Sequence, residues 1–141
     1  MNLVRVKLLN DKAVMPTYAD SGAAGFDFYA IKNLTIPVGR SGIVETGLAL
    51  EIPVGYEVQA RGRSGLAFKD DIIAHFGTID ESYRGEVKIK LWNLGNAPFR
   101  IIQGMRIAQG VLAPVERALF IEAFELGKTM RGVGGIGSTG A

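Results

Sequence analysis

The stretch TGLALEIPVGYEVQARGRSGLA, residues 46–67, contains a regular alternation that follows a turn signal. Residues 56–60 (YEVQA) alternate apolar side chains with charged or amide ones, which is typical of a half-buried β-strand. The preceding IPVG, residues 52–55, predicts a turn with proline at the second position and glycine at the fourth. The stretch therefore indicates a strand that begins directly after a tight turn.

The same alternation recurs near both ends of the sequence, at residues 4–8 (VRVKL) and 87–91 (VKIKL). A second IPVG at 36–39 predicts a similar turn, and the best helical segment is the short SGLAFKDD at 64–71, with Ser64 as the expected N-cap. Many short strands, 19 glycines and almost no helix predict an all-β fold.

We expect a single-domain β-barrel or jelly roll with a flexible glycine-rich C-terminal arm. The barrel is predicted for residues 1–126, and the arm for residues 127–141, closing over an active site. A chain of 141 residues is long enough for one core.

Composition excludes several classes of function. The sequence has no cysteine, which rules out disulfides and thiolate chemistry and favours the cytosol. The net charge of +2 and the pI near 9.0 come from basic residues scattered along the chain. We therefore expect no nucleic-acid partner. Short apolar runs interrupted by charge predict neither export nor membrane insertion.

RGVGGIGSTG, residues 131–140, contains the glycine spacing of a dinucleotide-binding turn. That motif needs a following helix and an acidic residue about 20 positions further on, and only Ala141 remains here. Two interpretations stay open. The segment is a mobile glycine tail, or Arg131, Ser138 and Thr139 form a phosphate clamp with glycine backbone N–H groups.

Three further segments gather polar residues, each with two interpretations. QARGRSGLAF, residues 59–68, is either a solvated strand end or an anion site built on Arg63 and Ser64. HFGTIDESYRGEV, residues 75–87, is either an ordinary hairpin turn or a site in which Asp80 activates water. In RIAQGVL, Gln109 either faces solvent or lines a pocket. His75 has no evident catalytic partner and is interpreted as structural.

The order of these segments is more informative than any one alone. The sequence resembles the deoxyuridine triphosphatases (dUTPases) along nearly its whole length, in five motifs: AAGFDF (23–28), GRSGLA (62–67), GTIDESYRG (77–85), GMRIAQ (104–109) and RGVGGIGSTG (131–140). The resemblance implies a β-rich jelly-roll subunit of a homotrimer with shared active sites. It also implies hydrolysis of dUTP to dUMP and pyrophosphate with Mg²⁺, which the substrate triphosphate mainly holds.

The resemblance also implies roles for residues on the barrel. Asp80 resembles the base that activates water, and the Tyr83 ring packs against the deoxyribose. Gln109 reaches the α-phosphate region, and Asp27 contacts the metal through water. The phosphates are bound by Arg63, Ser64 and Gly65. Uracil is bound through the backbone groups of Gly77, Thr78 and Ile79.

On the arm, the resemblance implies that Arg131, Ser138 and Thr139 fold over the γ-phosphate from a neighbouring subunit, with Ile136 and Gly137 beside the base. Three positions depart from the usual motifs. Met105 replaces an aspartate, Ile136 replaces an aromatic residue, and Ala74 stands where several relatives carry asparagine. We interpret these departures as changes of affinity rather than of chemistry.

Two other functions remain as alternatives on the same fold. One is a dCTP deaminase or a bifunctional deaminase, which would release ammonia. The other is a regulatory protein that binds dUTP as a switch and acts through a protein partner. The intact GTIDESYRG and the glycine-rich tail favour the triphosphatase.

Overall fold

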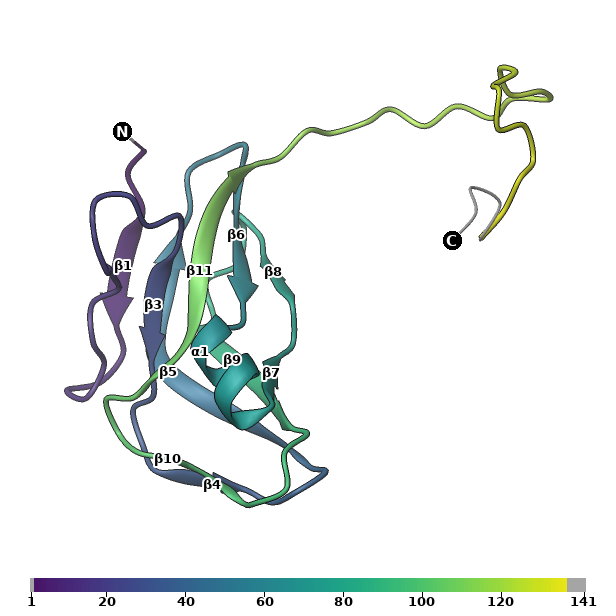
Figure 1. Ribbon diagram of the computed structural model, residues 1–141. Helices are drawn as coiled ribbons and strands as arrows, with labels where there is room; N and C mark the ends of the chain where they lie inside the picture. Colours follow the sequence, from purple (N-terminus) through teal and green to yellow (C-terminus); the bar gives the residue numbers. More distant parts are fainter. Residues whose placement is uncertain (1, 137–141) are drawn as a thin grey trace.

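The computed structural model describes residues 2–136 of the 141-residue chain (Figure 1). These residues form eleven strands and one short helix in the following order: β1 (Arg5–Leu8), β2 (Thr17–Tyr18), β3 (Phe26–Tyr29), β4 (Leu34–Ile36), β5 (Ser41–Glu51), β6 (Tyr56–Arg61), α1 (Ser64–Asp70), β7 (Ile72–Ala74), β8 (Gly77–Ile79), β9 (Glu86–Asn93), β10 (Phe99–Ile101) and β11 (Arg106–Pro114). In the part described, no helix is long and apolar enough to cross a membrane.

The strands form two main sheets with one core between them. One sheet has the order β1-β5-β9-β7, and the other has the order β2-β3-β11-β6-β8. A small third sheet pairs β10 with β4 at one end of the molecule (Figure 1). A single apolar cluster draws on both main sheets, with Phe28 and Val58 from one and Leu48 and Leu91 from the other. The expected all-β fold is therefore confirmed.

The predicted alternations correspond to β6, β9 and β1. In β9 Val87, Ile89 and Leu91 are buried and the two lysines between them are exposed. In β6 Val58 and Ala60 are buried. β1 is less buried than β6 and β9, and its Leu8 is 44 % exposed. β1 pairs only with β5 among the described strands, so its apolar side chains have fewer neighbours than those of a central strand.

Two local predictions need correction. In both IPVG turns the backbone N–H three residues after the proline donates to the proline carbonyl, Arg40 to Pro37 and Tyr56 to Pro53. Proline therefore takes the first position, and glycine takes the third, where its positive φ is needed. The predicted helix exists as α1, but Arg63 is its N-cap, without a side-chain cap, and Ser64 is its first residue.

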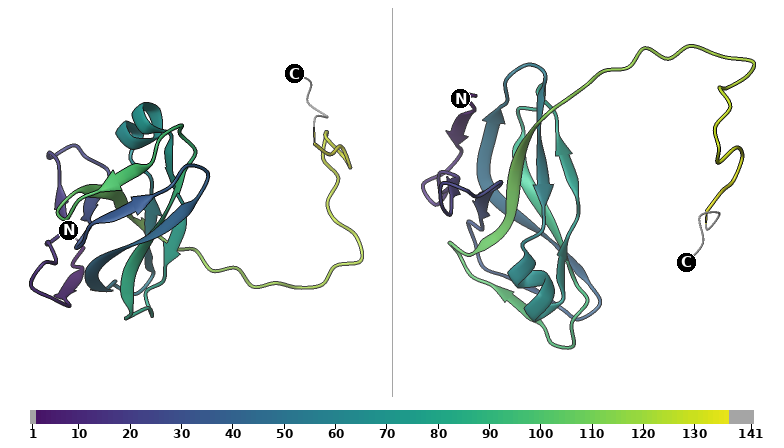
Figure 2. Two further views of the ribbon diagram at one scale, coloured as in Figure 1. Left: turned by 90° about the horizontal axis from the view of Figure 1, so that it is seen from below. Right: turned by 45° about the horizontal axis from the view of Figure 1, so that its top comes forward.

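The chain leaves the sheets at the end of β11, at Pro114. Residues 116–136 are exposed and run away from the sheets in every view (Figures 1 and 2). The segment 119–126 carries large apolar side chains, among them Phe120 at 91 % exposure. The described chain thus leaves the barrel before residue 127, where we expected the arm to begin, and the division at residue 126 stays a prediction for an assembled protein.

Candidate active site

A first cavity, called here the arginine cavity, lies on the five-stranded sheet and at the start of α1. Its volume is about 270 Å³. It is lined by Ala19, Ala23, Ala24, Gly25, Asp27, Arg63, Ser64, Gly65, Arg106 and Gln109. Five of the predicted site residues are therefore brought together here from two strands and the start of one helix.

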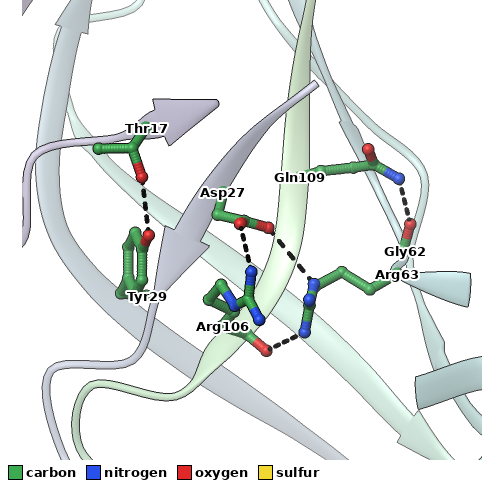
Figure 3. A network of polar contacts seen from close by, with 7 residues as sticks. All are labelled: Thr17, Asp27, Tyr29, Gly62, Arg63, Arg106 and Gln109. Carbon is green, nitrogen blue, oxygen red and sulfur yellow. Dashed lines mark hydrogen bonds and ion pairs between the residues drawn. The ribbon is translucent and has the colours of Figure 1, made fainter. Parts of the chain in front are cut away.

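Asp27 is the anchor of the arginine cavity (Figure 3). It is only 8 % exposed, and it faces away from the core because its neighbours Phe26 and Phe28 fill the core. Its two carboxylate oxygens pair with Arg63 Nε at 3.3 Å and Arg106 Nη1 at 3.2 Å. Arg63 also donates to the Arg106 carbonyl at 3.2 Å. One carboxylate faces two guanidinium groups, so the cavity keeps a net positive charge that favours an anion.

Gln109 lies beside Asp27 because the two residues are direct partners in the β11–β3 register. Its Nε2 donates to the Gly62 carbonyl at 2.9 Å, which fixes the amide orientation (Figure 3). Gly25 leaves room for this side chain, since a Cβ there would lie 2.5 Å from Gln109 Oε1. The amide group has a second N–H, which can donate to a ligand in the cavity.

A second cavity, called here the hairpin cavity, lies between β8 and β9. Its volume is about 280 Å³, and Gly77, Thr78, Ile79, Asp80 and Tyr83 line it together with residues 86–90, Ala60 and His75. β8 and β9 follow each other in the chain but belong to different sheets, so the turn between them connects the two sheets and the strands do not pair. β8 is an edge strand of its sheet and pairs only with β6 among the described residues.

The turn between β8 and β9 sets the positions of two predicted site residues. Tyr83 N–H donates to the Asp80 carbonyl at 3.0 Å, which closes a turn with these residues at its ends. The Tyr83 hydroxyl donates to the Glu86 carbonyl at 3.0 Å, so the ring lies over Gly85. A Cβ at Gly85 would lie 2.5 Å from the Tyr83 hydroxyl oxygen. The absence of a side chain at Gly85 therefore permits this ring position.

The two cavities share no lining residue, so within one chain the structure does not unite the predicted site. Asp80 and Tyr83 line one cavity, whereas Arg63 and Gln109 line the other. On the arm, Arg131 donates to the carbonyls of Gly134 and Gly135, and Ile136 is fully exposed. Gly137, Ser138 and Thr139 lie outside the described residues.

A family model for dUTPases matches residues 11–140, which is most of the sequence. The chain belongs to the dUTPase family. This confirms the family that the five segments predicted, and the homotrimer is the known state of that family.

Curated relatives and solved structures agree with the dUTPase assignment. The chain is 50 % identical over 139 residues to the deoxyuridine 5'-triphosphate nucleotidohydrolase of Nautilia profundicola, covering 97 % of this chain and 98 % of that protein. It is 46 % identical to the enzyme of the same name from Helicobacter hepaticus, covering 97 % and 88 %. Its fold matches the dUTPase of staphylococcal bacteriophage 80alpha with dUPNHPP, with a TM-score of 0.94, 26 % identity and full coverage of both chains. The jelly-roll expectation is thereby confirmed.

Sequence reasoning missed several residues of these dUTPase cavities, among them Arg106 and His75. Arg106 lines the arginine cavity and pairs with Asp27, although it stands 79 positions away in the sequence. Its place in GMRIAQ, three residues before Gln109, was the available signal. His75 was interpreted as structural but is exposed and lines the hairpin cavity. Its apolar neighbours gave no sign of that position.

The carboxylates of the described residues do not form a metal site by themselves. Among the described residues, no group of three or more His, Cys, Asp or Glu side chains could hold an ion. Mg²⁺ usually keeps several waters and takes one or two carboxylates plus substrate phosphates. Asp27, the carboxylate that lines the arginine cavity, fits that pattern through water, because its oxygens already accept bonds from two arginines.

Proposed function

We propose that the chain hydrolyses dUTP to dUMP and pyrophosphate, by attack of water on the α-phosphate. This reaction limits uracil in DNA and supplies dUMP for thymidylate synthesis. The observation that carries the proposal is that one chain presents a cationic cavity suited to phosphates and a separate hairpin cavity suited to a nucleoside. The named relatives are dUTP nucleotidohydrolases, and the phage protein was solved with a dUTP analogue.

The hairpin cavity is the proposed site for uracil. β8 is an edge strand, so Gly77, Thr78 and Ile79 carry backbone groups that β9 does not use. Backbone donors and acceptors at fixed positions reject a base that presents the opposite pattern, because its polar groups would be buried without partners. This supports discrimination of uracil from cytosine.

Tyr83 is the proposed sugar-recognition residue. Its ring is fixed at the hydroxyl end by the Glu86 carbonyl and lies over Gly85. A rigid aromatic face packed against deoxyribose leaves no space for a ribose 2′-hydroxyl. We therefore expect dUTP to be preferred over UTP.

The arginine cavity is the proposed phosphate site. Arg63 and Arg106 supply positive charge, and Ser64 and Gly65 are exposed at the mouth. Gln109 reaches the α-phosphate with its remaining N–H. The arm completes the site through Arg131, Ile136, Gly137, Ser138 and Thr139.

Asp80 is the proposed base. It takes a proton from water while the water oxygen bonds to the α-phosphorus. The bond from that phosphorus to the bridging oxygen breaks, and pyrophosphate leaves with the bridging oxygen. Positioning and charge stabilisation supply most of such catalysis, so no covalent nucleophile is needed. Mg²⁺, held by the triphosphate and by Asp27 through water, neutralises phosphate charge when bound.

We propose a homotrimer, in the cytoplasm, in which different subunits supply the two cavities and the arm of each site. Two features support assembly. The two cavities are separate within one chain, and segment 119–126 exposes large apolar side chains that need a partner to be buried. A second copy of the chain is the partner that the family implies.

A product assay tests the function directly. Purified protein is given dUTP, UTP, dCTP or dTTP with Mg²⁺, and pyrophosphate and ammonia are both measured. We expect one pyrophosphate per dUTP and at least a hundredfold lower kcat/KM for the other nucleotides. Ammonia from dCTP would instead identify a deaminase, and tight dUTP binding without hydrolysis would identify a regulatory binding protein.

A further inference from the structure

Three segments that are far apart in the sequence meet at Glu81. They are the β5–β6 turn at Gly55, the hairpin turn that follows Asp80, and the start of the arm at residues 115–117. A small cavity of about 180 Å³ lies among them, lined by Tyr56, Glu57, Asp80, Glu81, Ser82, Val115 and Arg117.

The Glu81 carboxylate joins these segments through both oxygens. Oε2 accepts the Gly55 N–H at 2.5 Å, and Oε1 pairs with Arg117 Nη2 at 2.9 Å. The Gly55 carbonyl accepts the Val115 N–H at 2.9 Å, so the arm is tied to the same turn a second time. The hairpin turn, the β5–β6 turn and the arm are thus connected through the Glu81 side chain and the Gly55 backbone.

The two bonds of Glu81 differ in strength. The Glu81 side chain is 23 % exposed, whereas that of Arg117 is 78 % exposed. A pair with so exposed an arginine contributes little by itself. A carboxylate that accepts a backbone N–H in a half-buried place is more strongly held, because the bond is charge-assisted. Gly55 therefore anchors Glu81, and Glu81 in turn orients Arg117.

Glu81 is the first of the two residues between Asp80 and Tyr83 in the hairpin turn. Any movement of its backbone changes the spacing between the proposed base and the proposed sugar-recognition residue. Misplacement of a reacting group by about 1 Å can cost about a hundredfold in rate. The anchor on Glu81 therefore acts on the geometry of catalysis.

We propose that Glu81 is a positioning residue that fixes the Asp80–Tyr83 turn and sets the direction in which the arm leaves the barrel. It contacts no substrate and acts through Asp80, Tyr83 and Arg117. This inference rests on the proposed function for its catalytic consequence, but the contact with the arm can be measured without activity.

The test compares Glu81→Ala, Glu81→Gln and Arg117→Gln with a matched control. The control is Glu51→Gln, which breaks the exposed Arg5–Glu51 pair of 3.1 Å. Active sites are counted by titration with the non-hydrolysable analogue dUpNHpp, so that unfolded protein does not lower the measured kcat. We expect kcat per site to fall about tenfold or more in Glu81→Ala and less in Glu81→Gln, which keeps an acceptor for Gly55. The dissociation constant of dUpNHpp should stay within about threefold.

Limited trypsin cleavage gives the second readout. Cleavage after Arg117 should become several-fold faster in Glu81→Ala and Glu81→Gln, while cleavage after the exposed Lys128 serves as the internal reference. If Glu81→Ala does not fold, Glu81→Gln decides the question through kcat and the cleavage ratio, and Arg117→Gln, which lacks this trypsin site, is compared by kcat alone. A kcat and a cleavage ratio equal to those of Glu51→Gln would overturn the inference. Failure of the unmodified protein to hydrolyse dUTP would overturn the proposed function instead, and the cleavage ratio would still test the contact.

Discussion

The space around Gly65 tells whether the fold itself requires a glycine at this position. A Cβ built at Gly65 meets no atom within 4 Å, whereas a Cβ at Gly25 would collide with Gln109. The fold therefore gives no reason for glycine at 65. We propose that close approach of a phosphate to the backbone N–H is that reason.

Replacement of Gly65 by alanine is therefore expected to leave stability unchanged and to weaken nucleotide binding. We expect the melting temperature to stay within about 2 °C and the dissociation constant of dUpNHpp to rise about tenfold or more, the effect of one weakened charge-assisted bond. Calorimetry and thermal melting measure the two quantities. Gly25→Ala serves as the contrast, because it should disturb Gln109 and lower stability as well. Unchanged affinity in Gly65→Ala would remove this position from the phosphate site.

Asp80→Asn tests the proposed base. The amide keeps the shape of the side chain but cannot take a proton from water, so kcat is expected to fall about 10²–10⁴-fold. Affinity for dUpNHpp should change only a few-fold. Steady-state kinetics with the same change at the exposed Asp11 as control gives the comparison. An unaltered kcat would refute the role of Asp80.

Ile136→Phe tests the proposed contact between the arm and the base. Isoleucine shields a base by apolar contact, but an aromatic ring adds stacking worth about 1–3 kcal/mol. The dissociation constant of dUpNHpp is expected to fall by about threefold to a hundredfold, with the smaller change favoured because the larger ring must fit an arm adapted to isoleucine. Equal affinity, measured by calorimetry, would mean that position 136 does not meet the base.

At the scale of elements, local sequence patterns predicted the strands better than they predicted where the turns and the helix begin. The alternation in β6 and β9 follows from side chains that point to opposite faces, so it is readable from sequence. The IPVG turns were placed one residue off, because only the hydrogen bond to Pro37 or Pro53 defines the first position. The helix start was misjudged because Ser64 makes no cap bond.

The candidate site was predictable where motifs lie within one segment and not where it depends on pairing between segments. Asp80 and Tyr83 share a turn, and their cavity could be expected. The pairing of Asp27 with Arg106 depends on the β3–β11 register, which no local pattern defines. His75 reaches the hairpin cavity because its N–H pairs with the Lys90 carbonyl beside β7 and β9, a contact that the sequence does not reveal.

Truncation after Lys128 tests the arm as an element. Residues 129–136 bury little surface in the described chain, so the truncated protein should fold and assemble with a melting temperature within about 2 °C of the full chain. Turnover is expected to fall sharply, because the γ-phosphate contacts and the exclusion of water are lost. Melting and dUTP kinetics on one sample measure both. Normal hydrolysis by the truncated protein would refute the closing role of the arm.

At the scale of the whole molecule, the proposed mechanism requires more than one chain, because the two cavities are separate within a subunit. An isolated subunit has the cationic cavity on its five-stranded sheet and the hairpin cavity between β8 and β9. One nucleotide must contact both under the proposed mechanism. In the trimer that we propose, a symmetric ring of identical chains brings the arginine cavity of one copy to the hairpin cavity of another and repeats the contact at each interface.

Mixed assembly of two inactive variants tests this account most directly. Arg63→Gln lacks a phosphate contact and Asp80→Asn lacks the base, so trimers of either variant alone should be nearly inactive. Refolded together in equal amounts, they form trimers in which one chain supplies an intact arginine cavity and its neighbour an intact hairpin. Random mixing then restores about a quarter of the sites. We predict recovery of about a quarter of the unmodified dUTP turnover, with mixed trimers verified by native mass spectrometry. Turnover no higher than the average of the two variants, in verified mixed trimers, would contradict the shared site.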